Sequence, residues 1–594
     1  MSRPTPHPDG RATRLLAATL RPEARPLAAI LAVLGVAMAL RLALPIVLGM
    51  FADHALDGAS VDHLSRLAGV YVAAALVGAA LDLLVVWWSA RVSWRAGNRL
   101  REQLAAHALR LEQAWHARHS PGQLIERIDG DVEAMAVFFA DIAVRAAGNV
   151  VLIVGMLVVA TVINPWVGLA LTVTAVVGAA VMVRLRLAAV GALEAEREVN
   201  AQLYGDLEER LGGLEDLRAN GAGGYAVHRL HTHSARSWRA SRYASLRGDS
   251  AYALAAVVFA VGSAATLAAG ILLQQRGVIT VGAVLTLYRF SDLLRRPLQE
   301  IAEQLKEFQR AMAGARRAST VLATEPAIAD GPGDGAVLPA GPLAVDLEGI
   351  TFSYGAERTP ALRSVDLHLA PGTHLGLVGR TGSGKTTIGR LLVRFWDVEV
   401  GTVRVGGVDV RDLRIAALRR RVAVVTQDVD LFRATVRDNL TLFGARPAPD
   451  ADLWAVLGRV GLRAWAAALP DGLDTRLDGG AGLSAGEGQL VALARAFLAD
   501  PDVVVLDEAS SRLDPATEAR IEAATTDLLA GRTALVIAHR LDTLAHMDEI
   551  AVLDRGRVAE HGRRVDLAGR PTSRYAGLLR ATAVDDMLDA EATA

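Results

Sequence analysis

The chain has 594 residues, more than one domain usually accommodates. Hydrophobic residues make up 52% of it and its mean hydropathy is +0.29, yet 21% of its residues are charged, so we expect a membrane part joined to a water-soluble part. The net charge of −1 argues against a general nucleic-acid-binding surface, and the lack of cysteine excludes disulfides, thiolate metal sites and a cysteine nucleophile.

Residues 1–26 contain arginines and prolines but no apolar core that ends in a small-residue cleavage site, so they do not resemble a signal peptide. Arg14–Leu20 has the pattern of a short amphipathic helix at a membrane surface. We expect residues 1–26 to be a cytoplasmic segment with such an elbow helix.

Six long apolar stretches follow, and each approaches or exceeds the ~20 residues that a helix needs to cross a bilayer. A buried helix of a soluble protein could explain one of them but not six. We therefore predict an all-α, polytopic membrane domain over residues 27–322. Its expected spans are Leu27–Met50, Leu67–Trp88, Ala136–Ile163, Trp166–Val183, Tyr252–Leu273 and Val278–Leu294.

Arginine is unevenly distributed among the connections between these spans. Phe51–Leu64 has no Lys or Arg, Asn164–Pro165 is a minimal turn, and the last connection has only Arg276. The other two connections, which include Arg91–Arg127 and Arg184–Arg247, are long and basic. Basic loops stay in the cytoplasm, so we predict that both termini are cytoplasmic. Almost every basic residue is Arg rather than Lys, which we interpret as the GC-rich coding bias of a bacterium. With the six spans, we therefore expect a protein of a bacterial inner membrane.

The two basic connections are too long to lack structure. Helical periodicity over Arg95–Leu111 and Leu193–Leu217 predicts that the transmembrane helices continue far past the membrane. Each extension ends at a break, at Ser120–Gly122 and at Asn220–Gly224. A helix that turns and returns in this way presents its tip to whatever lies below the membrane.

Residues 323–344 are rich in Gly, Pro and Ala and are predicted to be a linker. Over residues 345–594, short apolar strands alternate with helical segments, which is the pattern of an α/β domain with a mainly parallel sheet. Strands are predicted near Leu375–Val378, Val422–Thr426, Val503–Leu506, Ala534–Ala538 and Ile550–Leu553.

A phosphate-binding loop follows the first of these strands, because Gly379–Thr386 matches G-x-x-x-x-G-K-[ST] in full and precedes a predicted helix. Its glycines let backbone N–H groups close around phosphate oxygens, Lys385 adds a positive charge, and the Thr386 hydroxyl can ligate Mg²⁺. A Gly-rich turn without a ligand is the alternative, and the strand–loop–helix context disfavours it. We therefore predict that ATP and Mg²⁺ bind here. The predicted ATP-binding residues are Gly379, Arg380, Thr381, Gly382, Ser383, Gly384, Lys385, Thr386 and Thr387.

Two carboxylates, Asp507 and Glu508, end the apolar strand near Val503–Leu506. The carboxyl ends of parallel strands meet at the sheet edge where the phosphate-binding loop also lies. Asp507 is then suited to hold Mg²⁺ through water, and Glu508 to orient or deprotonate the attacking water. Asp-Glu after a strand is often only a solvated turn, but the loop upstream favours the catalytic interpretation.

With these motifs, residues 345–580 resemble the nucleotide-binding domain of an ATP-binding cassette (ABC) transporter. Four further positions match that family's motifs. The resemblance implies that Tyr354 stacks on adenine and that Gln427 senses Mg²⁺ and the membrane domain. It also implies that Asp514 lies in the loop that crosses between paired ATPase domains, and that His539 lies near the γ-phosphate.

The whole chain resembles a half-transporter of the exporter fold, in which six spans precede an α/β P-loop ATPase domain. Trp115–Glu133 resembles the family's first coupling helix, and Asn220–Tyr225 is placed like the second. The predicted spans exclude a soluble ABC ATPase.

In this family each ATP lies between one domain's phosphate-binding loop and the signature of a second domain, usually Leu-Ser-Gly-Gly-Gln. The corresponding segment here begins at Leu483 and keeps Ser484 and Gly486. Ala485 stands where Gly is expected and adds a Cβ where a backbone must approach a phosphate. Glu487 stands where Gln is expected and adds an anion near a γ-phosphate.

Neutral drift could explain both departures, but pairing with a different half-transporter is the specific alternative. The chain keeps Lys385, Asp507, Glu508 and His539, so its loop would form a competent site with a partner's consensus signature. Its own signature would cap the partner's ATP at an impaired site. We therefore predict a heterodimer whose other chain lacks the catalytic glutamate.

Charges inside membrane spans are costly and are candidates for function. Asp141 and Arg145 are spaced to pair with each other, and Tyr288, Arg289 and Asp292 of the sixth span could face a central cavity. No residue pattern names the substrate. The intramembrane charges are Arg41, Asp82, Asp141 and Arg145.

The resemblance implies ATP-driven export of a lipophilic or amphipathic small molecule, a lipid or a peptide by alternating access. Import by the same fold, as in siderophore uptake, is the nearest alternative. An ATP-gated regulatory or channel-type ABC protein is an alternative of another class, which Glu508 and the lack of a regulatory insert disfavour.

Overall fold

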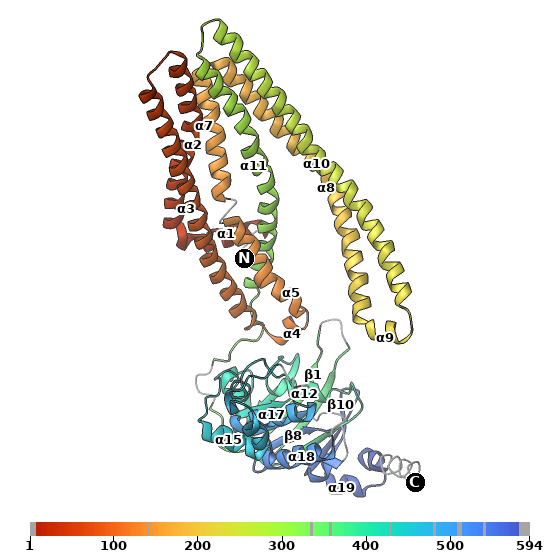
Figure 1. Cartoon of the computed structure of the whole chain (residues 1–594). Helices are drawn as coiled ribbons and strands as arrows, with labels where there is room; N and C mark the ends of the chain where they lie inside the picture. Colours follow the sequence, from red (N-terminus) through yellow and green to blue (C-terminus); the bar gives the residue numbers. More distant parts are fainter. Residues whose placement is uncertain are drawn as a thin grey trace, which may run out of the picture. The chain divides into compact units, whose positions relative to one another are not determined.

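The computed structural model describes residues 8–139, 143–332, 337–355, 359–427, 429–478, 483–507, 514–538 and 542–580. The chain divides into two compact units (Figure 1). A helical unit comprises Met1–Arg110 and Ser120–Glu325, and an α/β unit comprises Leu111–His119 and Pro326–Ala594.

The helical unit consists of long helices joined by short turns. Its elements are α1 (Pro8–Leu20), the 3₁₀ turn η1 (Arg21–Glu23), α2 (Ala24–Leu56), α3 (Val61–Ala108), α5 (Pro121–Ile125), the π-helical turn η2 (Glu126–Gly130), α6 (Asp131–Val137), α7 (Ala143–Ile163), α8 (Pro165–Gly212), α9 (Leu214–Ala219), α10 (Gly223–Gln275) and α11 (Val281–Leu322). Ser60, Asn164 and Thr280 cap α3, α8 and α11, because their side-chain oxygens accept backbone N–H groups that a helix start leaves without a partner. The predicted N-terminal helix at Arg14–Leu20 is confirmed as part of α1.

Five helices in the described part of the chain are long and apolar enough to cross a membrane. They are Gly10–Leu56, Val61–Ala108, Val144–Ile163, Pro165–Gly212 and Gly223–Gln275. The sixth predicted span, Val278–Leu294, lies largely in α11 and is helical, but α11 is not among these five. Four charged residues in its first half, from Arg289 to Arg296, reduce its hydropathy.

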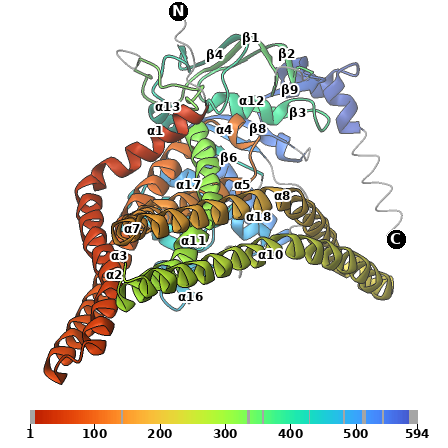
Figure 2. The same cartoon turned by 90° about the horizontal axis from the view of Figure 1, so that it is seen from above.

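Most of each predicted extension is confirmed as a continuation of a long helix, since α3 runs to Ala108 and α8 to Gly212; the end of the second extension forms the separate helix α9. The helices α3, α8 and α10 have 48, 48 and 53 residues. At 1.5 Å per residue they are about 70–80 Å long, against the ~30 Å of a bilayer's hydrocarbon core. Figure 1 shows α8 and α10 running together as far as α9, and Figure 2 shows the same two helices from above; we call their distal part, residues 200–240, the arm.

The α/β unit contains two sheets. Its strands are β1 (Val345–Phe352), β2 (Leu362–Leu369), β3 (His374–Val378), β4 (Val400–Val405), β5 (Val408–Asp409), β6 (Val422–Val425), β7 (Val503–Asp507), β8 (Thr533–Ile537), β9 (Glu549–Asp554) and β10 (Arg557–Arg563). An antiparallel sheet has the order β2-β1-β4-β5, and a second sheet has the order β10-β9-β3-β8-β7-β6. In the second sheet all pairs are parallel except β10 with β9.

All five predicted strands are confirmed, as β3, β6, β7, β8 and β9, and all belong to the parallel part of the second sheet. Every residue of β7 and β8 is buried. Parallel strands covered on both faces are continuously apolar, which is why the sequence alone reveals them.

The helices of the α/β unit cover both faces of this sheet. They are α4 (Gln113–His116), α12 (Lys385–Leu392), α13 (Ile415–Arg421), α14 (Val436–Thr441), α15 (Asp450–Arg459), α16 (Arg463–Ala468), η4 (Gly472–Asp474), α17 (Ala485–Ala499), α18 (Pro515–Leu529), η5 (Asp542–His546) and α19 (Arg564–Gly569). One apolar core joins α12 to the antiparallel sheet, and another joins α14, α15, α17 and α18 to the other face.

The segment predicted as the first coupling helix, Trp115–Glu133, is not one helix. Its first residues, including the buried Trp115, belong to the α/β unit, and the rest forms α5, η2 and α6 of the helical unit. The breaks follow from Ser120, which caps α5, and from Pro121 at that helix's first position.

Candidate functional site

The phosphate-binding loop connects β3 to α12, and its shape requires glycine. Gly379, Gly382 and Gly384 have φ angles of 151°, 79° and 105°, which other residues adopt only with strain. A Cβ on Gly379 would also lie 2.2 Å from the carbonyl oxygen of Leu553. The backbone therefore keeps the tight curve that lets successive N–H groups surround an anion at the start of α12.

Lys385, the first residue of α12, is almost fully buried in this loop. Its Nζ donates to the carbonyl oxygens of Gly379 at 2.6 Å and Arg380 at 3.3 Å. Burial lowers the pKa of the Lys385 amine, and the charge of Asp507 opposes that shift. The buried hydroxyl of Ser383 has no hydrogen-bond partner among the described residues. A phosphate group would accept hydrogen bonds from the Lys385 amine and the Ser383 hydroxyl, so these residues fit the phosphates of ATP.

Asp507 ends β7 and lies next to Thr386 of α12, so the two residues that the sequence analysis expects to bind Mg²⁺ are adjacent. The Thr386 hydroxyl donates to Oδ2 of Asp507 at 2.8 Å, and Asp507 is 7% exposed. A hydroxyl and a carboxylate side by side next to a phosphate-binding loop are hard oxygen donors of the kind that Mg²⁺ prefers.

Tyr354 follows β1 and lies beside α12. Its hydroxyl donates to Thr387 Oγ1 at 3.0 Å and accepts from Arg390 Nη1 at 3.3 Å, and its ring lies edge-on to Trp396 at 5.2 Å. The sequence analysis missed Arg390 and Trp396. Arg390 lies on the exposed side of α12, and an aromatic pair separated by 42 positions leaves no local sequence signal.

The signature segment forms the start of α17, with Ser484 as its N-cap. The Ser484 hydroxyl accepts from the Glu487 N–H at 3.2 Å, and the Glu487 carboxylate accepts from the Ser484 N–H at 2.9 Å. This reciprocal pair is a capping box. Glu487 therefore has a structural role in this chain, and it places a carboxylate at the helix end where the family's signature meets a γ-phosphate.

Asp514 is the N-cap of α18, where its Oδ1 accepts from the Thr517 N–H at 2.9 Å. Hydrogen bonds from Thr517 hold the pKa of this carboxyl below its usual range. Gln427, which follows β6, is exposed. Glu508 and His539 lie outside the described residues. The strands that precede them pair at their ends, with Asp507 opposite Ile537.

Arg495 of α17 is a residue that the sequence analysis missed. Its guanidinium donates to the carbonyl oxygen of Asn439 at 2.8 Å and, through both terminal nitrogens, to that of Asp430 at 3.1 and 3.2 Å. It thus ties the signature helix to the segment that follows Gln427. Burial lowers the pKa of the Arg495 guanidinium, with the charge of Asp430 opposing the shift. An Arg inside an apolar helix pattern was the available signal.

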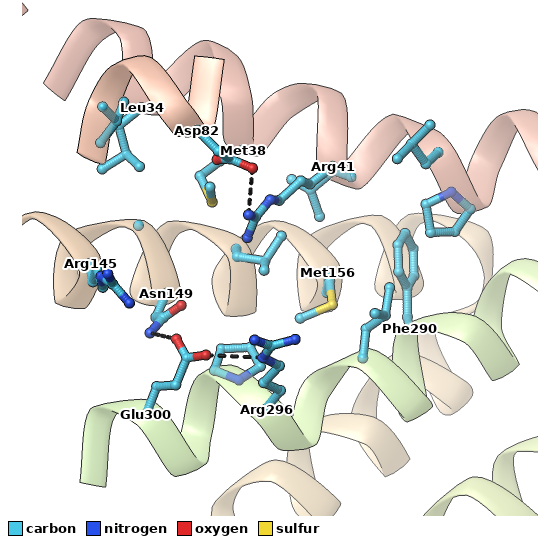
Figure 3. A pocket seen from close by; sticks show the side chains of 18 of the residues that line it. Leu34, Met38, Arg41, Asp82, Arg145, Asn149, Met156, Phe290, Arg296 and Glu300 are labelled. Carbon is cyan, nitrogen blue, oxygen red and sulfur yellow. Dashed lines mark hydrogen bonds and ion pairs between the residues drawn. The ribbon is translucent and has the colours of Figure 1, made fainter. Parts of the chain in front are cut away.

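Three of the four predicted intramembrane charges line a cavity of the helical unit (Figure 3). Arg41 of α2 and Asp82 of α3 form an ion pair at 2.6 Å, and Arg145 lines the same cavity. Asp141, the predicted partner of Arg145, lies outside the described residues. Of the three residues predicted to face a cavity from α11, Arg289 lines it, whereas Tyr288 and Asp292 are not among its lining residues.

Comparison with known proteins agrees with these two units. Residues 27–298 match the family model of the ABC transporter transmembrane region, and residues 362–511 match the model described as ABC transporter. An ATP-dependent lipid A-core flippase of Ralstonia nicotianae is 30% identical over 574 residues, which cover 95% of each chain. The chain belongs to the ABC transporter family.

Other similar ABC proteins differ in length and described activity. A lipid A-core flippase of Dechloromonas aromatica is 31% identical over 84% of each chain. A multidrug efflux ATP-binding/permease protein of Mycobacterium bovis is 35% identical over 508 residues, but this ABC chain spans only 42% of its length. A solved bacterial Atm1-family ABC exporter with ATP bound has a TM-score of 0.77 and 26% identity over 95% of this chain and 99% of that one.

These similarities confirm the half-transporter architecture of this ABC chain, a helical multi-pass membrane domain followed by an α/β ATP-binding domain.

Proposed function

We propose that this chain is one half of a transporter that uses ATP hydrolysis to export a lipophilic or amphipathic molecule. The observation that carries the proposal is the joining of two units in one chain. One unit has membrane-length apolar helices around a cavity, and the other has a complete phosphate-binding loop. Relatives described as a lipid A-core flippase and a multidrug efflux protein support export over import or channel-type gating.

In the proposed ATP site, the loop's N–H groups and Lys385 hold the phosphates, and Tyr354 positions the adenine. Thr386, Asp507 and Gln427 hold Mg²⁺, which when bound neutralises charge on the phosphate oxygens. The hydrogen bond from Thr386 to Asp507 supports this assignment. Glu508 is proposed to orient the attacking water, and His539 to contact the γ-phosphate.

We further propose that the chain pairs with a second, different half-transporter. The Glu487 carboxylate, which caps the start of α17, supports an impaired ATP site at this chain's signature. The arm also indicates that a second chain binds, because large apolar side chains on it are exposed. Exposed apolar patches mark interaction surfaces. Their exposed fractions are 67% for Tyr204, 60% for Leu211, 61% for Tyr225 and 63% for Trp238.

The proposed topology places the chain in a bacterial inner membrane with both termini in the cytoplasm. It assigns residues 1–26 to an N-terminal segment, 27–322 to the membrane domain, 323–344 to a linker and 345–594 to the ATPase domain. The absence of Lys and Arg from Phe51–Leu64 supports this orientation.

Vesicles that contain the purified chain, alone or coexpressed with a candidate partner, test the function. ATP-dependent accumulation of a lipophilic dye, a lipid or a ferric siderophore is measured with ATP outside, in wild type and in Glu508→Gln. Export predicts accumulation inside inverted vesicles that Glu508→Gln abolishes. Transport in the opposite direction would indicate import, and ATP-dependent ion leakage would indicate a channel. A lone chain that turns over ATP as fast as the pair would contradict the heterodimer.

A further inference from the structure

A cavity of about 500 Å³ lies among α2, α3, α7 and α11 (Figure 3). Most of its walls are apolar side chains, among them Leu34, Met38, Met156 and Phe290. The volume lies within the ~300–1,000 Å³ of small-molecule sites, which suits one drug-sized molecule rather than a lipid with several chains.

The polar part of this cavity has an excess of positive charge. Its charged lining residues comprise four arginines and two carboxylates, a difference of +2. They are Arg41, Arg145, Arg289, Arg296, Asp82 and Glu300.

Both carboxylates already accept hydrogen bonds from guanidinium groups of the cavity. Asp82 accepts from Arg41 at 2.6 Å, and Glu300 accepts from Arg296 at 3.1 Å and from Asn149 at 3.0 Å. A cationic ligand would have to compete with these ion pairs. The cavity therefore offers little to a cation and disfavours it by charge.

Arg289 differs from Arg41 and Arg296 because no carboxylate of the cavity is paired with it in the described structure. Its ion-pair partner, Asp292, is 3.7 Å away, is 59% exposed and does not line the cavity. A guanidinium cannot deprotonate, and an incompletely neutralised charge inside a membrane is costly. An anionic group in the cavity would offset that cost through paired N–H···O bonds.

We propose that this cavity binds a small amphiphile with a phosphate-like or carboxylate headgroup. Arg289 contacts the headgroup, and the apolar walls of α2 and α7 contact the tail. The proposal rests on the proposed function, because it names the class of molecule that the transporter would carry.

Binding of radiolabelled decyl phosphate to the full chain in neutral maltoside detergent tests this proposal. The Lys385→Met background disables the phosphate-binding loop as a competing anion site. Unlabelled decyl phosphate is expected to displace the label, whereas decyltrimethylammonium and inorganic phosphate are expected to need at least tenfold higher concentrations. Equal displacement by the cation would overturn the anionic class, and equal displacement by inorganic phosphate would overturn the amphiphile.

Two arginines of the same helix, α11, locate the site. Arg289→Gln is expected to weaken decyl phosphate binding about tenfold, which corresponds to about 1.4 kcal/mol. Arg289→Lys keeps the charge and should recover part of the affinity. Arg295→Gln is the matched control, because Arg295 is exposed on the same helix and does not line the cavity. Unchanged binding in Arg289→Gln, or an equal loss in Arg295→Gln, would overturn the assignment.

Thermal unfolding of each variant checks its fold. If Arg289→Gln does not fold, the competition between decyl phosphate, decyltrimethylammonium and inorganic phosphate at the unmutated cavity still tests the proposal. The outcomes also separate this inference from the proposed function. Vesicles that export a neutral lipophile while the cavity shows no preference for the anion would refute the inference alone. Selective anion binding without ATP-dependent transport would refute the function alone.

Discussion

Glu487 caps the start of α17, and under the proposed pairing it would also act on a shared ATP site. Its carboxylate accepts from the Ser484 N–H and so supplies a hydrogen bond that the start of α17 needs. The same carboxylate lies where the helix dipole would otherwise favour a phosphate. At an effective dielectric of about 20, two like unit charges ~4 Å apart repel by about 4 kcal/mol. A fraction of that energy would be enough to impair the site.

Glu487→Gln is expected to keep the capping box and to remove the charge. ATP turnover by assembled chains should therefore rise several-fold, with little change in the unfolding temperature. Glu487→Ala removes the cap as well and is expected to destabilise the α/β unit by about 1 kcal/mol. Steady-state ATPase assays and thermal unfolding measure both effects.

The capping box of α14 provides the matched control for this prediction. There Thr435 and Asp438 make the same reciprocal hydrogen bonds without belonging to the signature. Asp438→Asn should leave ATP turnover unchanged. A similar rise in both variants, or none in Glu487→Gln, would show that the Glu487 charge does not limit the site.

Replacing Lys385 is predicted to weaken ATP binding but to raise the stability of the folded protein, and the effect on stability depends on pH. Burial lowers its pKa below the usual ~10.4, so the folded state carries the cost of a buried charge at neutral pH. Lys385→Met should therefore raise the unfolding temperature at pH 7. The gain should shrink as the pH rises through the lowered pKa toward ~10.4, because the folded lysine then neutralises first. ATP binding should weaken at least tenfold, as expected for lost charged hydrogen bonds of ~1.5–3 kcal/mol.

Thermal unfolding of both proteins between pH 7 and 10 measures this effect. Lys385→Arg serves as the control, because arginine stays charged over this range. The difference in unfolding temperature between Lys385→Arg and Lys385→Met should therefore not shrink as the pH rises. A difference between wild type and Lys385→Met that does not vary with pH would contradict the linkage.

Among the elements, the contact of α2 with α11 depends on two glycines. A Cβ on Gly49 would lie 2.5 Å from the carbonyl oxygen of Gly282 and 2.3 Å from Thr286 Oγ1. Next to this contact, the Asp53 carboxylate accepts from the Gly282 N–H at 2.6 Å. The helix backbones thus approach more closely than any larger residue permits, as small residues allow in membrane bundles.

Gly49→Ala is expected to separate these helices and to lower the stability of the helical unit by about 1–3 kcal/mol. Gly35→Ala is the control, because Gly35 lies in the same helix and a Cβ there would meet no neighbouring atom of the described residues within 4 Å. That variant should be neutral or slightly stabilising. Thermal unfolding in detergent compares the two, and an equal loss in both would show that the cause is not the contact.

The elements that the sequence predicted best are those with an unbroken local pattern. The five segments predicted as strands consist almost entirely of apolar residues, and the phosphate-binding loop is a contiguous motif. The capping box also has a local sequence signature, Ser-x-x-Glu before an apolar run, although the sequence analysis interpreted Glu487 only as a departure from the family's glutamine. Contacts such as Arg495 with Asp430 and Tyr354 with Thr387 join distant positions, so only the folded chain brings them together.

In the whole molecule, the sequence predicted the order of the two units but not how charges group within the membrane. Arg41 and Asp82 are 41 positions apart, and Asn149 and Glu300 are 151 apart, so no local spacing indicates that these pairs form. The sequence indicates the break at Ser120 and Pro121 that starts α5, but not that the residues before it, including Trp115, belong to the other unit.

A transporter in which both units act together must link the two binding events, and the linkage is reciprocal. If ATP changes the affinity for an anionic amphiphile by some factor, the amphiphile must change the affinity for ATP by the same factor. With a non-hydrolysable ATP analogue and decyl phosphate, we expect a factor of about 5 or more, measured by equilibrium binding of each ligand with and without saturating amounts of the other. Lys385→Met should abolish the linkage while keeping amphiphile binding, because it alters only the ATP site. Arg289→Gln should abolish it while keeping analogue binding. No change of either affinity by the other ligand, or a linkage that survives in Lys385→Met, would mean that the amphiphile acts outside the coupled cycle.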